Sequence, residues 1–282
     1  MSHLSIIQII VLALLQGVTE LFPISSLGHT ILLPALLGWG NLVTDTKFLA
    51  LVVALHLGTS IALIIYFKND WIQVIKSVVK SVIDGDIRSG TDSWVGWLVI
   101  IGCLPGGFLG LFLDTPLKHV FGIPVIAAIF LIGNGFILFF GERLYKNKKT
   151  KTSKKLSSLS WKDAIFIGFA QALALIPGIS RSGSSIVAGL MSGLDHEDAA
   201  RYSFLLGAPL ISAAAILEIP SLLGQSRTIT TYIIIGVVLS GIAAYISTKF
   251  LLAYFKTNTL KPFAYYSWIA GILALILILT GK

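Results

Sequence analysis

Charged residues and cysteine are both scarce in this chain. Of its 282 residues only 12% are Asp, Glu, Lys or Arg, and there is one cysteine, Cys103. So little charge excludes an ordinary soluble domain, in which about 25% of residues are charged. A single cysteine excludes an internal disulfide framework or a centre built on several cysteine ligands. Hydrophobic residues make up 55% of the sequence and the mean hydropathy is +0.89, which predicts a polytopic helical membrane protein.

Several apolar runs reach about 18 to 20 residues, the length needed to cross roughly 30 Å of hydrocarbon. The N-terminal stretch is not typical of a cleaved signal peptide, because it contains Gln16 and Glu20 and lacks a basic leader. The sequence therefore predicts an all-α integral membrane protein with six spans, over residues 48–67, 94–113, 122–140, 203–219, 232–252 and 263–279.

One stretch of the sequence occurs twice. Residues 16–29 (QGVTELFPISSLGH) align without a gap with residues 171–184 (QALALIPGISRSGS), so that Ser25 falls on Ser180. Each copy interrupts an apolar segment with Pro, Ser and Gly. Non-helical backbone at membrane depth is tolerated where it is buried in protein or lines a polar cavity. We therefore predict two re-entrant helix pairs, over residues 1–38 and 161–194.

The positions of the basic residues predict how the chain is oriented. Residues 142–160 are rich in lysine and read as a flexible, basic cytoplasmic linker, and the loop over 68–93 falls on the same side. Residues 1–141 and 161–282 then each hold one re-entrant pair and three spans. Because three is odd, the second half lies upside down, as in inverted repeats that form a site near the midplane. Membrane-flanking loops explain the net charge of +8 better than nucleic-acid binding does.

The two breaks carry polar groups that are expensive to bury. An ionisable group at membrane depth costs about 2.5–3.5 kcal/mol on insertion scales, so Glu20 and Arg181 need partners or a wet cavity. One interpretation is an ion pair that locks the halves together. That interpretation leaves His29 and the neighbouring serines unexplained. Arginine, serine hydroxyls and the N–H groups at the start of a short helix together form an oxyanion site, which is our preferred interpretation.

At these motifs the sequence resembles the bacterial undecaprenyl-diphosphatases, the bacitracin-resistance family, over essentially its whole length. The resemblance is carried by residues 20–29 (ELFPISSLGH), 177–183 (PGISRSG) and 193–204 (GLDHEDAARYSF). It implies an integral membrane enzyme that hydrolyses the diphosphate of the C55 carrier lipid to undecaprenyl phosphate and inorganic phosphate. Such enzymes recycle the carrier for peptidoglycan and cell-wall synthesis and confer bacitracin resistance.

The resemblance also implies catalytic roles by motif position, for Glu20, Ser26, His29 and Arg181. Gln16 stands where the family has Glu or Gln, and a glutamine is neither a charged base nor a strong metal ligand. This weakens any mechanism that needs two carboxylates. The resemblance further implies a need for Mg²⁺ or Ca²⁺, for which Glu20 is the expected ligand. The expected substrate-binding residues are Gln16, Ser25, Ser180, Ser182, Gly183 and Ser184.

These roles predict a mechanism. Arg181 and the nearby N–H groups neutralise the diphosphate. Ser26 attacks the terminal phosphorus or holds the attacking water, and His29, one turn further along the short helix, takes or donates the proton. Glu20 orients His29 or holds a cation against the phosphates.

Other polar residues have simpler interpretations. His56 lies in a span, where a packed, hydrogen-bonded histidine is the favoured interpretation over one that lines a lipid cavity. Asp195 and Asp198 are spaced for a helix N-cap rather than for a metal site.

The main rival function is a secondary transporter or lipid flippase, because inverted repeats with broken helices are typical of transporters. A membrane scaffold would leave the polar groups without purpose. The other common membrane phosphatase superfamily has a second histidine that is absent here. We expect a multi-pass protein of the bacterial inner membrane whose site opens to the outer face, with a polyprenyl diphosphate and membrane lipids as partners, no nucleic acid, and a homodimer as one form of assembly.

Overall fold

The computed structural model describes residues 4–43, 47–88, 90–147 and 153–281, and within these ranges every regular element is a helix. The first half of the chain contains α1 (Ile6–Thr19), α2 (Ser26–Leu36), α3 (Gly40–Val43), α4 (Phe48–Tyr66), α5 (Lys68–Ile83), α6 (Thr91–Val120) and α7 (Pro124–Lys146). The second half contains α8 (Trp161–Ala172), α9 (Arg181–Ser192), α10 (His196–Glu218), α11 (Arg227–Tyr254) and α12 (Lys261–Thr280). Three short 3₁₀ turns complete the fold: η1 (Leu156–Ser158), η2 (Leu173–Leu175) and η3 (Ile219–Leu222).

Among the described residues, six helices are long and apolar enough to cross a membrane, which confirms the predicted number of spans. They are Phe48–Tyr66, Thr91–Leu113, Pro124–Lys146, His196–Glu218, Arg227–Tyr254 and Lys261–Thr280. The predicted N-cap of α10 is also confirmed, because the Asp195 carboxylate accepts a hydrogen bond from the Asp198 N–H at 2.8 Å.

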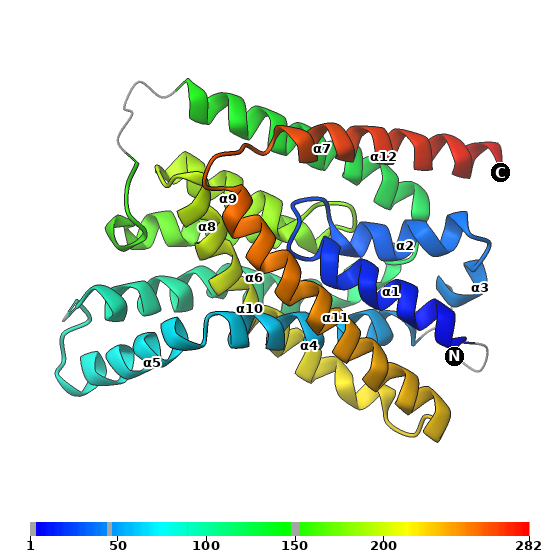
Figure 1. The fold of residues 1–282 in the computed structure, drawn as a ribbon, viewed down its shortest axis with the longest axis horizontal. Helices are drawn as coiled ribbons and strands as arrows, with labels where there is room; N and C mark the ends of the chain where they lie inside the picture. Colours follow the sequence, from blue (N-terminus) through cyan, green and yellow to red (C-terminus); the bar gives the residue numbers. More distant parts are fainter. Residues whose placement is uncertain (1–3, 44–46, 89, 148–152, 282) are drawn as a thin grey trace.

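The two broken segments are built alike. α1 and α2 pack side by side around a break at residues 20–25, and α8 and α9 do the same around a break at residues 176–180 (Figure 1). Each of the helices α1, α2, α8 and α9 is shorter than any of the six spans, as a helix that turns back within the membrane must be. That the pairs are re-entrant stays a prediction.

The helices of the two halves interleave. α1 of the first half packs on α11 of the second, and α8 of the second half packs on α6 of the first. α7 and α12 lie against each other along one edge of the molecule (Figure 1). Each half therefore covers the broken pair of the other, which is the arrangement that an inverted repeat predicts. The division at residues 1–141 and 161–282 stays a prediction.

Two stretches expected to be loops contain regular or packed structure. Within residues 68–93, Lys68–Ile83 form the amphipathic helix α5, which packs on the first turns of α6. The predicted linker 142–160 begins with the last turn of α7 and ends as a packed segment. There Lys154 pairs with Leu194, and the Trp94 indole donates to the Leu159 carbonyl at 2.9 Å. Lys148, Lys149 and Lys151 of that linker lie outside the described residues.

Candidate active site

A serine caps the helix that follows each break. The Ser25 hydroxyl accepts a hydrogen bond from the Gly28 N–H at 3.2 Å, and the Ser180 hydroxyl accepts one from the Gly183 N–H at 3.0 Å. Capping satisfies N–H groups that have no partner within the helix. Ser25 has a φ of +70°, a left-handed conformation that is uncommon for a residue other than glycine. Strained backbone of this kind is concentrated at functional sites.

Asn134 of α7 holds the two breaks together. Its side-chain Nδ2 donates to the Pro23 carbonyl at 2.9 Å, and its Oδ1 accepts from the Ser180 N–H at 3.0 Å. Both bonds are buried, and one amide therefore fixes the spacing between a loop of each half. The sequence analysis missed this residue, because one asparagine in an apolar span carries no sign of what it faces.

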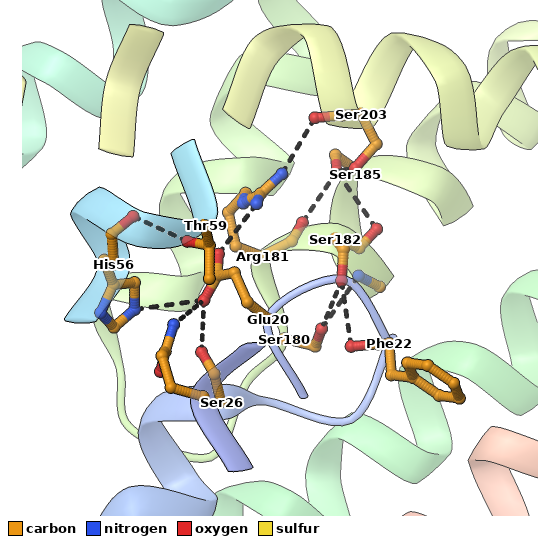
Figure 2. A network of polar contacts seen from close by, with 12 residues as sticks. Glu20, Phe22, Ser26, His56, Thr59, Ser180, Arg181, Ser182, Ser185 and Ser203 are labelled. Carbon is orange, nitrogen blue, oxygen red and sulfur yellow. Dashed lines mark hydrogen bonds and ion pairs between the residues drawn. The ribbon is translucent and has the colours of Figure 1, made fainter. Parts of the chain in front are cut away.

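Glu20 is the centre of a polar network (Figure 2). One carboxylate oxygen, Oε1, lies 2.8 Å from Nη2 of Arg181. The other, Oε2, accepts from the Ser26 hydroxyl at 2.5 Å and from Nε2 of Gln16 at 3.1 Å, and it lies 3.1 Å from Nε2 of His56. Four donors around one carboxylate stabilise its ionised form inside the membrane.

The Arg181 side chain occupies a slot made by a glycine. Besides Glu20, its guanidinium contacts the Ser203 carbonyl, to which Nη1 donates at 2.9 Å. A Cβ atom at Gly207 of α10 would lie only 2.3 Å from Nη1, so no larger residue fits there without displacing the guanidinium. Nε of Arg181 is buried and has no hydrogen-bond partner among the described residues. The slot, Glu20 and the Ser203 carbonyl together fix where the guanidinium lies.

A cavity of about 710 Å³ leads away from this network. At one end it is lined by the polar residues Glu20, Ser25, Ser26, His56, Ser180 and Arg181. Its remaining walls are mostly apolar and come from the first half of α4, the second halves of α6 and α10, and the stretch from the end of α8 through η2 to the second break. Gln171, Glu218 and Ser221 are polar exceptions in these walls. A polar end and a long apolar wall suit a ligand with an anionic head and a hydrocarbon tail.

The other predicted binding residues lie around the cavity end rather than in its wall. The Ser182 hydroxyl lies 3.1 Å from that of Ser180 and donates to the Phe22 carbonyl at 3.2 Å. Gly183 packs on Pro23, and Ser184 is buried with no hydroxyl partner in the described part of the chain. Gln16 is connected to the site by the hydrogen bond that its Nε2 donates to Glu20. Nothing in this geometry assigns these residues to a substrate, so their binding roles stay predictions.

His29 does not contact Glu20, contrary to the prediction that Glu20 orients it. Its Nδ1 donates to the Ser25 carbonyl at 2.7 Å, and its Nε2 lies 2.8 Å from the hydroxyl of Tyr266 on α12. Because Nδ1 carries the hydrogen, the neutral ring accepts the tyrosine O–H at Nε2. His29 thus braces the strained Ser25 backbone and is not among the described residues that line the cavity.

His56 lines the cavity and contacts Glu20, so the favoured interpretation of a packed span histidine is incomplete. Its Nδ1 does form the expected backbone hydrogen bond, to the Val52 carbonyl at 2.7 Å. A histidine in an apolar run signals a polar neighbour, but only the packing of α4 shows that the neighbour is Glu20.

The predicted divalent cation does not fit the donor set of this site. Among the described residues no group of three or more His, Cys, Asp or Glu side chains could hold a metal ion. Glu20 is the only carboxylate in the network, and its two oxygens already accept from two neutral donors and face Arg181 and His56. Hard cations such as Mg²⁺ require several oxygen ligands, so a cation next to Glu20 would have to take most of its ligands from the diphosphate.

Comparison with known proteins agrees with this geometry. The family model described as "Bacitracin resistance protein BacA" matches residues 9–273. A protein of Chromobacterium violaceum named "Undecaprenyl-diphosphatase 2" is 44% identical, covering 96% of this chain and 98% of the relative. A protein of Acidiphilium cryptum named "Undecaprenyl-diphosphatase" is 41% identical, covering 96% and 98%. One of Frankia alni, named "Undecaprenyl-diphosphatase 2", is 37% identical, covering 98% of each. The chain belongs to the bacitracin resistance protein BacA family.

Proposed function

We infer that this membrane protein hydrolyses undecaprenyl diphosphate to undecaprenyl phosphate and inorganic phosphate. The observation that carries the inference is a network of Glu20, Ser26 and Arg181 at the polar end of an apolar cavity, in a chain whose relatives are named for this reaction. The reaction recycles a lipid carrier for peptidoglycan and cell-wall synthesis. Recycling also explains the link to bacitracin resistance in the family name.

Arg181 binds the anionic head in this proposal. A guanidinium can make two parallel hydrogen bonds to phosphate oxygens, and its planar fork is pre-organised for them. Arg181 lines the polar end of the cavity, so the head of a lipid bound there would lie next to its guanidinium. Ser25 and Ser180, at the same end, offer hydroxyl and backbone groups to the phosphates.

Ser26 is the proposed nucleophile. Its hydroxyl donates to Glu20 at 2.5 Å, so that Glu20 is the acceptor to which the serine proton passes as the oxygen attacks the terminal phosphorus. A bond forms between the Ser26 oxygen and that phosphorus, and the bond from phosphorus to the bridging oxygen breaks. Undecaprenyl phosphate leaves. Water then attacks the phosphoserine, the bond between phosphorus and the Ser26 oxygen breaks, and Glu20 returns the proton to that oxygen, which gives inorganic phosphate and free serine. Arg181 stabilises the charge on the transferred phosphoryl group.

His29 supports this chemistry indirectly in the proposal. Its two ring nitrogens are taken by the Ser25 carbonyl and the Tyr266 hydroxyl, which fixes the first turn of α2 and hence Ser26. A direct proton transfer by His29 would first require the Tyr266 contact to break.

The proposed site opens to the outer face of the bacterial inner membrane. Part of the apolar wall comes from the start of α4 and the ends of α6 and α10, which the positive-inside rule puts outside. In Figure 1 the hairpin between α10 and α11 lies at the opposite end of the molecule from residues 153–160, which belong to the basic linker. This arrangement supports product release on the outer side. A homodimer stays a prediction.

The test is phosphate release from undecaprenyl diphosphate by the purified protein in detergent micelles, where transport across a membrane cannot occur. We expect one inorganic phosphate for each undecaprenyl phosphate formed. A protein that binds the lipid in micelles but releases no phosphate would contradict the proposal and favour the flippase interpretation.

A further inference from the structure

His56 is part of the polar network but lies on α4, a helix that borders neither of the two breaks. It lies in the middle of α4, lines the cavity, and places Nε2 at 3.1 Å from Oε2 of Glu20 (Figure 2). The same oxygen accepts the Ser26 hydroxyl. His56 of α4 and Ser26 of α2 therefore contact the same oxygen, Oε2 of Glu20.

The partners of His56 determine what the ring can do. Nδ1 faces the Val52 carbonyl at 2.7 Å, and Nε2 faces the Glu20 carboxylate. Both partners only accept hydrogen bonds, so the ring satisfies them with a hydrogen on each nitrogen. His29 differs, because one of its partners is the Tyr266 hydroxyl, which can donate. The charged groups that act on His56 are Glu20 and Arg181, and Glu218 lines the same cavity at the end of α10.

Binding of a diphosphate creates a problem that His56 can solve. Glu20 and Arg181 face each other at 2.8 Å before any ligand enters. A diphosphate, with several negative charges, competes for the guanidinium. A buried carboxylate that loses its cationic partner is strongly destabilised, and it tends to turn away or become neutral. Either response would break its hydrogen bond with Ser26.

We propose that His56 is a positioning residue of the active site, which holds Glu20 against Ser26 while Arg181 engages the diphosphate. This inference rests on the proposed function. Because His56 acts through Glu20 on the nucleophile, its loss should lower kcat with little change in KM. A merely structural histidine would instead reduce the amount or the stability of folded protein.

The chain offers a matched control for such a histidine. His196 lies 2.8 Å from Glu142 in a second buried pair, away from the cavity lining. The side chains are similarly buried, with exposed fractions of 12% and 0% for His196 and Glu142 against 15% and 5% for His56 and Glu20. His196→Leu therefore reports what the loss of a buried His–Glu contact does to the fold alone.

The experiment compares His56→Leu, His56→Gln and His196→Leu with the wild type in detergent. It measures kcat and KM for undecaprenyl diphosphate and the unfolding temperature of each variant. A hydrogen bond to a charged group contributes about 1.5–3 kcal/mol, so we expect His56→Leu to lose about 10- to 100-fold in kcat. His56→Gln keeps a side-chain donor and should recover much of that loss. His196→Leu should change the unfolding temperature but not kcat of the folded protein.

Three results would overturn the inference. The first is a kcat of folded His56→Leu within about threefold of the wild-type value. The second is a His56→Gln variant that is as inactive as His56→Leu. The third is a loss of kcat in His196→Leu equal to that in His56→Leu. A wild-type protein that releases no phosphate would instead overturn the proposed function itself, and the inference with it.

Discussion

Glu20 and Arg181 form a 2.8 Å ion pair although they are 161 positions apart in the chain. Each comes from the break of a different half, and Asn134 links the same two breaks through Pro23 and Ser180. The site therefore exists only when both halves are folded against each other.

Arg181→Lys should be nearly inactive. A lysine ammonium is a point charge and cannot contact Glu20, the Ser203 carbonyl and a phosphate with the geometry of a guanidinium fork. We expect kcat to fall about 100- to 1,000-fold, the loss typical of removing a donor to a developing oxyanion. The measurement is phosphate release at saturating lipid. Arg201→Lys, which alters the ion pair with Asp70 away from the cavity lining, is the control and should stay close to wild type. Similar activity in both variants would remove Arg181 from the mechanism.

Gly207→Ala should abolish most activity while leaving the fold intact. Alanine is about 1 kcal/mol more favourable than glycine inside a helix, so the change does not weaken α10 by propensity. Its Cβ would, however, lie 2.3 Å from Nη1 of Arg181 and push the guanidinium out of its slot. The check is phosphate release together with the unfolding temperature.

The control for that substitution is Gly133→Ala in α7, where an added Cβ meets no atom within 4 Å. We expect this variant to behave like the wild type. If Gly207→Ala also keeps full activity, Arg181 does not need the position that the structure gives it.

Asn134→Leu should lower activity by separating the two breaks. Leucine has the same branching at Cγ but cannot bond to the Pro23 carbonyl or the Ser180 N–H, each of which then lacks a buried partner. Such losses cost about 1–3 kcal/mol each, so we expect both a lower unfolding temperature and a fall of at least about tenfold in kcat. Asn134→Asp retains an acceptor for Ser180 and should lie between leucine and wild type. An Asn134→Leu variant with normal kinetics would show that the spacing of the breaks does not matter.

Much of this arrangement could be predicted from the sequence because the signals are local. The apolar runs predicted the six spans, and the repeated motif placed Glu20 and Arg181 in equivalent breaks, which lie together in the structure. The N-cap by Asp195 was visible in the spacing of two aspartates.

What the sequence could not predict depends on how helices rotate and pack. The spacing of Ser26 and His29 suggested that they act as a pair, but the His29 ring turns to Tyr266, 237 positions away. His56 faces Glu20 because of the rotation of α4, and Gly207 matters only because Arg181 lies against it. The stretch 68–93 was expected to be a loop because its lysines obscured the apolar residues of α5.

The central claim is that the phosphoryl group is transferred at Ser26, and the rate of Ser26→Ala tests it most directly. The measurement is phosphate release from undecaprenyl diphosphate in detergent, with Ser240→Ala as the control, since Ser240 is a buried serine of α11 that is not among the described residues lining the cavity. We predict that Ser240→Ala retains wild-type turnover and that Ser26→Ala loses at least about 1,000-fold, roughly 4 kcal/mol of transition-state stabilisation. Folded Ser26→Ala protein that turns over at a rate near wild type would contradict the account.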